Sequence, residues 1–136
     1  GKEIIKKLEE CEVLIHEYTV IPDKINDIQS ITKTQVDKKI DLLIFTGGTG
    51  LSPRDITPEA IRPMLDREIP GIMEAARTFG QERTPYSMLS RGIAGVVDDT
   101  LILTLPGSTK GAKESMEALF PSLLHIFRIF KGARHD

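Results

Sequence analysis

The chain has 136 residues, a length that favours one domain and leaves no room for a second complete one. Its 40% apolar and 28% charged residues are typical of a globular protein and exclude a disordered or fibrous chain. Eighteen basic against twenty acidic residues give a net charge of −2, which argues against nucleic acid as a partner.

The amino-terminal part predicts a helix, a strand and a second helix. Ile4 and Leu8 lie one helical turn apart among lysines and glutamates, the pattern of a short amphipathic helix. The β-branched and aromatic residues of 13–21 indicate a strand, which Pro22 ends. Asp23 is placed to cap the helix that follows.

The rest of the chain continues this alternation of strands and helices. Residues 41–46 form a nearly continuous apolar run, typical of a parallel strand that is covered on both faces, and glycines end it. The remaining pattern predicts helices from Thr57 to Leu65, near 72–79, at 85–89 and near 113–130, and strands over 92–97 and 100–105 joined by a turn at Asp98-Asp99.

Alternating strands and helices imply right-handed crossovers and a mainly parallel sheet between two helical layers. The sequence contains no internal repeat and no low-complexity linker. We therefore expect a single three-layer α/β/α domain over residues 1–136, with its ligand site in the loops at the carboxyl ends of the strands.

The loop of residues 46–55 has the composition of an anion-binding site. Its three glycines let main-chain N–H groups approach phosphate oxygens, and Thr49 and Ser52 add hydroxyl groups. Arg54 can neutralise negative charge. Asp55 would repel a phosphate unless a cation lies between them, so the loop favours a nucleotide bound with Mg²⁺.

This loop matches neither of the common nucleotide-binding fingerprints. The sequence contains no Gly-x4-Gly-Lys-Ser/Thr motif, and Gly48-x-Gly50 lacks the third glycine of the dinucleotide pattern. The loop by itself leaves two interpretations open, an anion cradle and a tight turn.

Three blocks of sequence resemble the molybdenum-cofactor-biosynthesis family: residues 46–60, residues 84–95, and Leu105–Ser108 with Lys110-Gly111. Their order and spacing are similar to those of the molybdopterin adenylyltransferases and the G domain of gephyrin. The resemblance implies a three-layer α/β/α fold and a homotrimer. It also implies transfer of AMP from Mg-ATP to the terminal phosphate of molybdopterin, with release of pyrophosphate.

The resemblance assigns roles to individual residues. Asp23 and Asp55 match two acids implicated in metal-assisted catalysis, and Ser90 matches a serine of the adenylylated-product site. The substrate-cradling loop of the family corresponds to Gly47, Gly48, Thr49 and Gly50. Ser108 and Lys110, which follow a predicted strand, are candidates for a second anion contact beside Arg54.

Simpler structural roles exist for several of these residues. Asp23 and Ser108 can be helix caps, and Asp55 can cap the helix at Thr57 or pair with Arg54. Ser90 has no histidine near it in sequence, so a hydrogen-bonding role is expected and a nucleophilic role is not.

The family also begins with an apolar strand, and its Ser-Gly element aligns at Gly1. We therefore expect that the working protein has residues before Gly1 that supply a first strand missing here.

The apolar stretches, the single cysteine and the histidines indicate where the protein is located and which chemistry it does not use. No apolar stretch approaches the roughly 18 residues of a membrane-spanning helix and no signal segment opens the chain, so we expect a cytoplasmic protein without a membrane partner. Cys11, the single cysteine, is expected to be a packing residue. His16, His125 and His135 lack ligand spacing, so no zinc site is expected.

The sequence favours an adenylyltransferase that uses Mg²⁺, ATP and molybdopterin. One alternative is a non-catalytic homotrimeric module that binds the pterin or acts as a scaffold, because a fold alone does not guarantee turnover. A weaker alternative is a nucleotide pyrophosphatase.

Overall fold

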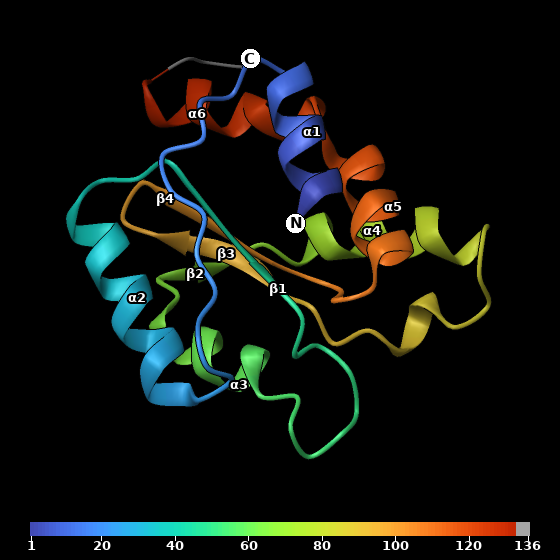
Figure 1. The fold of residues 1–136 in the computed structure, drawn as a ribbon. Coiled ribbons are helices and arrows are strands. Elements are labelled where there is room, and N and C mark those ends of the chain that lie inside the picture. Colours follow the sequence, from blue (N-terminus) through green and yellow to red (C-terminus); the bar gives the residue numbers. More distant parts are fainter. Residues whose placement is uncertain (133–136) are drawn as a thin grey trace.

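The computed structural model describes residues 1–132 and shows a sheet between two layers of helices (Figure 1). Within these residues the strands lie in the order β1, β4, β3, β2, with bounds Leu42–Thr46, Thr100–Leu105, Ala94–Val97 and Arg67–Glu68. β1 pairs with β4 in parallel, whereas β4–β3 and β3–β2 are antiparallel. The α/β class and the three layers are confirmed. The sheet is mixed and not mainly parallel, because the tight turn at Asp98-Asp99 can join only antiparallel strands.

Helices cover both faces of this sheet. One face carries α1 (Lys2–Glu10), α4 (Pro70–Gln81), α5 (Thr109–Leu119) and α6 (His125–Phe130). The other face carries α2 (Ile25–Asp37) and α3 (Thr57–Ile61). Short 3₁₀ turns are η1 (Arg62–Met64), η2 (Ser87–Leu89) and η3 (Ser122–Leu124). No helix in residues 1–132 combines the length and the apolar character needed to cross a membrane.

β4 is the centre of the molecule, and all of its residues are buried. Leu101, Leu103 and Leu105 belong to the core under α1, α4 and α5, whereas Ile102 belongs to the core under α2 and α3. Alternate residues of a strand point to opposite faces, so one strand anchors both helical layers. Cys11 packs against the first of these cores, as expected.

The strand expected over 13–21 does not form. These residues run from the end of α1 to the start of α2 without pairing with any strand in the described chain (Figure 1). A groove of about 800 Å³ is lined by this segment on one side and by β1 on the other. A β-rich composition favours extended backbone, but a strand also needs a partner about 4.8 Å away. The groove also leaves the apolar residues of β1 half-buried, where the sequence predicts full cover.

The single helix expected near 113–130 is also wrong. α5 ends at Leu119, and the chain continues through Pro121 and η3 into α6. Proline has no N–H to donate and its ring clashes with the preceding turn, so it interrupts a helix. The apolar residues Met116, Leu119 and Phe120 lie in the core.

Two of the three expected helix caps differ from the structure. Lys24 occupies the N-cap of α2, so Asp23 lies one residue before the cap and does not cap the helix. Ile56 is the N-cap of α3 and no side chain caps this helix, so Asp55 does not cap it. Ser108 does cap α5, because its Oγ accepts a hydrogen bond from the N–H of Gly111 at 3.1 Å.

Candidate functional site

The loops that follow β1 and β4 meet at one edge of the sheet. The two strands are parallel and in register, with Thr46 opposite Leu105, so both loops leave the sheet at the same level. The N–H of Gly47 donates to the carbonyl of Leu105 at 2.9 Å. A Cβ on Gly107 would lie 3.1 Å from the Cα of Gly47, so the two loops touch through glycines. The first and third sequence blocks therefore form one surface.

Arg91 joins the second block to this surface. Its backbone N–H donates to the carbonyl of Thr49 at 2.8 Å. Its guanidinium donates to the carbonyls of Gly50 at 2.6 Å and Asp55 at 2.7 Å, and also reaches the carboxylate of Glu59 at 2.6 and 3.2 Å. One side chain thus fixes the middle and the end of the loop 46–55 and the first turn of α3.

The charges of this cluster reinforce each other. The hydrogen bond from Arg91 lowers the pKa of Glu59, and the same bond raises the pKa of Arg91. Both side chains remain partly exposed, at 33% for Arg91 and 49% for Glu59, so the pair orients the loop more than it stabilises the fold.

The glycine loop depends on left-handed backbone. Gly47 has φ +91° and Gly48 has φ +69°, values that residues with a Cβ rarely adopt. A Cβ on Gly48 would also collide with Oγ1 of Thr57. The carbonyl of Gly48 accepts the N–H of Thr57 at 3.1 Å, which ties the loop to α3.

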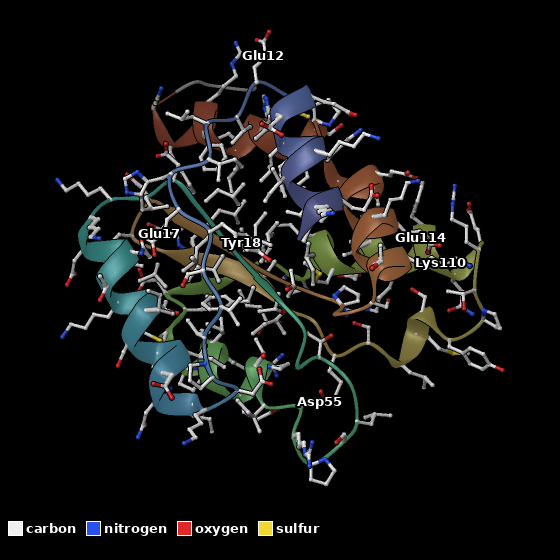
Figure 2. The ribbon with its side chains drawn as sticks, viewed as in Figure 1. Glu12, Glu17, Tyr18, Asp55, Lys110 and Glu114 are labelled. Atoms are coloured by element: carbon white, nitrogen blue, oxygen red, sulfur yellow. The ribbon has the colours of Figure 1, made fainter. Side chains whose placement is uncertain are left out.

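Asp55 folds back across the loop. Its Oδ2 accepts the N–H of Ser52 at 2.9 Å and would lie 2.8 Å from a Cβ on Gly50. Figure 2 labels Asp55 in this loop. The helix after it has no side-chain cap, and within residues 1–132 no ion pair joins Asp55 to the exposed Arg54. The two simpler roles of Asp55, a cap and a partner of Arg54, are therefore wrong in the described structure.

A cavity of about 250 Å³ lies beside these loops. Its wall is built from α4, the segment around η2, the loop after β4 and α5, and includes Gly80, Ser87, Ser90, Ser108, Glu114 and Ser115. Two residues predicted for the site, Ser90 and Ser108, thus line one cavity. Lys110 is exposed and does not line it.

Arg77 fixes the segment that carries Ser90. Its Nη1 donates to the carbonyls of Ser90 at 3.3 Å and Gly92 at 3.0 Å. The hydroxyl of Ser90 accepts the N–H of Gly92 at 3.4 Å, so its hydrogen bond in the described structure is with backbone and not with a base. This agrees with a hydrogen-bonding role for Ser90.

Asp23 lies apart from this cavity. It is exposed and lines the groove beside β1, together with Thr46 and Thr57 at the two ends of the glycine-loop region. In residues 1–132 no group of three or more His, Cys, Asp or Glu side chains is arranged to hold a metal ion. His135 lies outside the described residues.

Sequence reasoning missed Arg91, Glu59, Arg77 and Glu114. Arg91 follows Ser90 inside a block that the sequence singles out, but its partners lie 32 to 41 residues away in the chain. Glu114 looks like an ordinary polar helix position. The local sequence around Arg91 and Glu114 does not distinguish them from charged side chains that are exposed to solvent.

The fold and these loops define an α/β domain with a candidate site at the carboxyl ends of its parallel strands. The family described as "probable molybdopterin binding domain" matches residues 1–125, and the chain belongs to this family.

Several relatives are similar over most of this chain. Gephyrin of Dictyostelium discoideum is 45% identical over 125 residues, and molybdenum cofactor biosynthesis protein B of Staphylococcus aureus is 37% identical over 123 residues. The crystal structure of the molybdopterin biosynthesis enzyme MoaB from Thermus thermophilus is similar with a TM-score of 0.90 and 43% identity, covering 99% of this chain and 86% of that chain.

The lengths of these relatives differ widely. The match covers 91% of this chain but 17% of the Dictyostelium gephyrin, and 88% of this chain and 73% of the Staphylococcus protein. The chain therefore spans about a sixth of the gephyrin and most of the shorter relative.

Proposed function

We propose that this protein acts in molybdenum cofactor biosynthesis by transferring AMP from ATP to the terminal phosphate of molybdopterin. The observation that carries the proposal is the meeting of three loops in one site. Gly47 bonds to Leu105, and Arg91 joins its own segment to the glycine loop. The names of the relatives support the pathway and the pterin. The nucleotide and the transfer step rest on the chemistry of the loops.

The loops supply the contacts that a phosphorylated substrate needs. Gly47 and Gly48 hold the loop in left-handed backbone, and Ser90 and Ser108 bring hydroxyl groups to the adjacent cavity. Lys110 and Arg54 are exposed cations near the rim that can attract phosphates without being held in place.

The carboxylates fit a magnesium ion that arrives with the nucleotide. Proteins commonly bind Mg²⁺ through one or two carboxylates together with substrate phosphates, and Asp55 and Asp23 would supply such oxygens. When bound, Mg²⁺ neutralises charge on the triphosphate. Asp55 is already held by the N–H of Ser52, so its carboxylate is oriented before any ligand binds.

The reaction requires alignment of two substrates. A phosphate oxygen of molybdopterin attacks the α-phosphorus of ATP, and the bond to the β-phosphate breaks and releases pyrophosphate. Because the acceptor attacks directly, Ser90 positions a substrate and forms no covalent bond to it. Holding both phosphates in the glycine loop converts a bimolecular encounter into an aligned one, which is the main source of rate in such transfers.

The test is an incubation of the full-length protein with molybdopterin, ATP and Mg²⁺, followed by mass detection of the adenylylated pterin and of pyrophosphate. We expect both products in equal amounts. Pterin binding without transfer would replace this proposal by the non-catalytic module. Pyrophosphate release from ATP without pterin would replace it by the pyrophosphatase.

A further inference from the structure

Arg77 of α4 directs its guanidinium at the backbone of the segment that carries Ser90. The side chain is partly buried, and its Nη1 donates to the carbonyls of Ser90 at 3.3 Å and Gly92 at 3.0 Å. Among residues 1–132 no carboxylate forms an ion pair with Arg77. In this part of the chain, its side-chain contacts therefore serve the segment 90–92 and no charged partner.

The segment 90–92 is held from two opposite sides. Ser90 has extended backbone, with φ −70° and ψ 132°. In extended backbone, neighbouring residues direct their hydrogen-bonding groups to opposite sides. The contacts follow this alternation, because Arg77 holds the carbonyls of Ser90 and Gly92 while the N–H of Arg91 donates to the carbonyl of Thr49 at 2.8 Å. The segment thus connects α4 to the glycine loop.

The anchors on either side of this segment leave its own position to Arg77. After the segment, the N–H of Ile93 donates to Oγ1 of Thr104 in β4 at 2.7 Å. Before it, the side chain of Gln81 accepts an N–H of η2 at 3.0 Å. Of the described side chains, only that of Arg77 bonds to the backbone of Ser90. Removing its guanidinium would therefore free Ser90 while both anchors remain.

We propose that Arg77 is a positioning residue, which sets the place of Ser90 relative to the glycine loop and thereby aligns the substrates for AMP transfer. This inference rests on the proposed function for the identity of the reaction. One guanidinium nitrogen carries two N–H groups, so it can bridge two carbonyls. A misplacement of about 1 Å can slow a reaction by about a hundredfold, even when its cause lies outside the reacting groups.

The first experiment measures the steady-state kinetics of AMP transfer by full-length Arg77→Met, which keeps the apolar stem and removes the guanidinium. We expect kcat to fall by about tenfold to a hundredfold and KM for ATP to change by less than about threefold. The effect on KM is small because Gly47 and Gly48 bond to Leu105 and Thr57, and neither bond involves Arg77.

Two further variants provide the rescue and the control. Arg77→Lys should recover part of kcat, because an ammonium group can still donate to a carbonyl. Arg83→Met makes the same substitution just after α4, at an exposed arginine that donates to the carbonyl of Phe79 at 2.6 Å. It should leave kcat unchanged, because Arg83 does not contact the segment 90–92 in the described structure.

A double-mutant cycle separates positioning from a general effect on the fold. If Arg77 acts through Ser90, adding Arg77→Met to Ser90→Ala should slow transfer by less than about threefold more. If Arg77 only stabilises the fold, the two losses should multiply. Losses that multiply fully, or an unchanged kcat in Arg77→Met, would overturn the inference.

Amide hydrogen exchange tests the same contact without activity. The amide of Arg91 should exchange at least about tenfold faster in Arg77→Met, whereas the amides of β4 should keep their rates. If the melting temperature shows that Arg77→Met does not fold, Arg77→Lys takes its place, with a smaller increase expected. Unchanged exchange at Arg91 would overturn the inference whether or not the protein transfers AMP. Faster exchange in a protein whose unmodified form transfers no AMP would refute only the proposed reaction.

Discussion

Arg91 shapes the site because one planar group reaches three residues of the glycine loop and α3. Its guanidinium donates to Gly50 and Asp55 and pairs with Glu59. A lysine carries a single ammonium group and cannot make this fork. We expect Arg91→Lys to lower the melting temperature by a few degrees and to slow AMP transfer, whereas Arg128→Lys on the exposed face of α6 should change neither. Unchanged AMP transfer in Arg91→Lys would show that the reaction does not need the guanidinium contacts with Gly50, Asp55 and Glu59.

The Glu59–Arg91 pair gives the fold a defined pH dependence. The pKa of Glu59 is lowered in the folded protein, so the pair stabilises the fold above the ordinary carboxyl value of 4.5. This contribution disappears as the pH falls through the lower folded pKa. The difference in melting temperature between the unmodified protein and Glu59→Gln should therefore be present at pH 7 and shrink at acidic pH. A difference that stays constant down to strongly acidic pH would contradict the pairing.

Asp55 is the residue whose charge the proposed reaction needs. Asp55→Asn keeps an oxygen for the N–H of Ser52, so loop geometry and melting temperature should be preserved. Removing the charge should slow AMP transfer by about a hundredfold or more and raise the Mg²⁺ concentration required. Asp99→Asn, in the turn at the opposite end of β4, is the matched control. Normal transfer with normal Mg²⁺ dependence in Asp55→Asn would end the metal role.

Sequence reasoning reached part of this site and missed the rest for a physical reason. The glycine loop, Ser90 and Ser108 carry local signals, since glycines mark unusual backbone and a serine after a strand marks a cap. Arg91 and Glu114 act through contacts with distant segments. A charged side chain has the same letter in the sequence whether it is solvated or buried against another segment.

At the scale of elements, Gly48 packs the loop after β1 closely against α3. Gly48→Ala would force a Cβ onto Thr57 Oγ1 at a backbone φ of +69°. We expect a loss of about 1–3 kcal/mol in the free energy of unfolding. Gly71→Ala provides the control, since nothing lies within 4 Å of its Cβ and it sits in the first turn of α4. Gly71→Ala should gain about 0.5–1 kcal/mol by helix propensity. Urea unfolding of both variants measures the contrast, and equal stabilities would refute it.

Elements were predictable from sequence where local pattern decides them. The buried run of β4 and the turn at Asp98-Asp99 are as expected. The strand predicted over residues 13–21 does not form, because a strand needs a neighbouring strand to pair with. Amino-acid composition does not show whether such a neighbour is present. The break in the last helix was readable, since Pro121 stands within the expected span. The hydrophobic spacing continues across Pro121, but the missing N–H of proline interrupts the helix.

At the scale of the whole molecule, we predict a homotrimer. Tyr86, Met88 and Leu89 expose apolar surface around η2, at 72%, 66% and 52%, next to the site. Exposed apolar side chains grouped in one segment are typical of an interaction surface. Light scattering of the full-length protein should give three times its monomer mass, which is 15.1 kDa for these 136 residues. A monomer mass at working concentration would contradict the trimer.

The most direct test of the central claim, that three loops act as one site, is amide NMR with α,β-methylene-ATP, Mg²⁺ and 6-hydroxymethylpterin. The nucleotide analogue cannot be cleaved at the bond that the reaction breaks, so the complex persists during the measurement. We predict shift changes in residues 47–55, 84–92 and 105–111 together, with the amides of α6 unchanged. Shift changes confined to one of these loops, or to the groove between residues 13–21 and β1, would contradict the account.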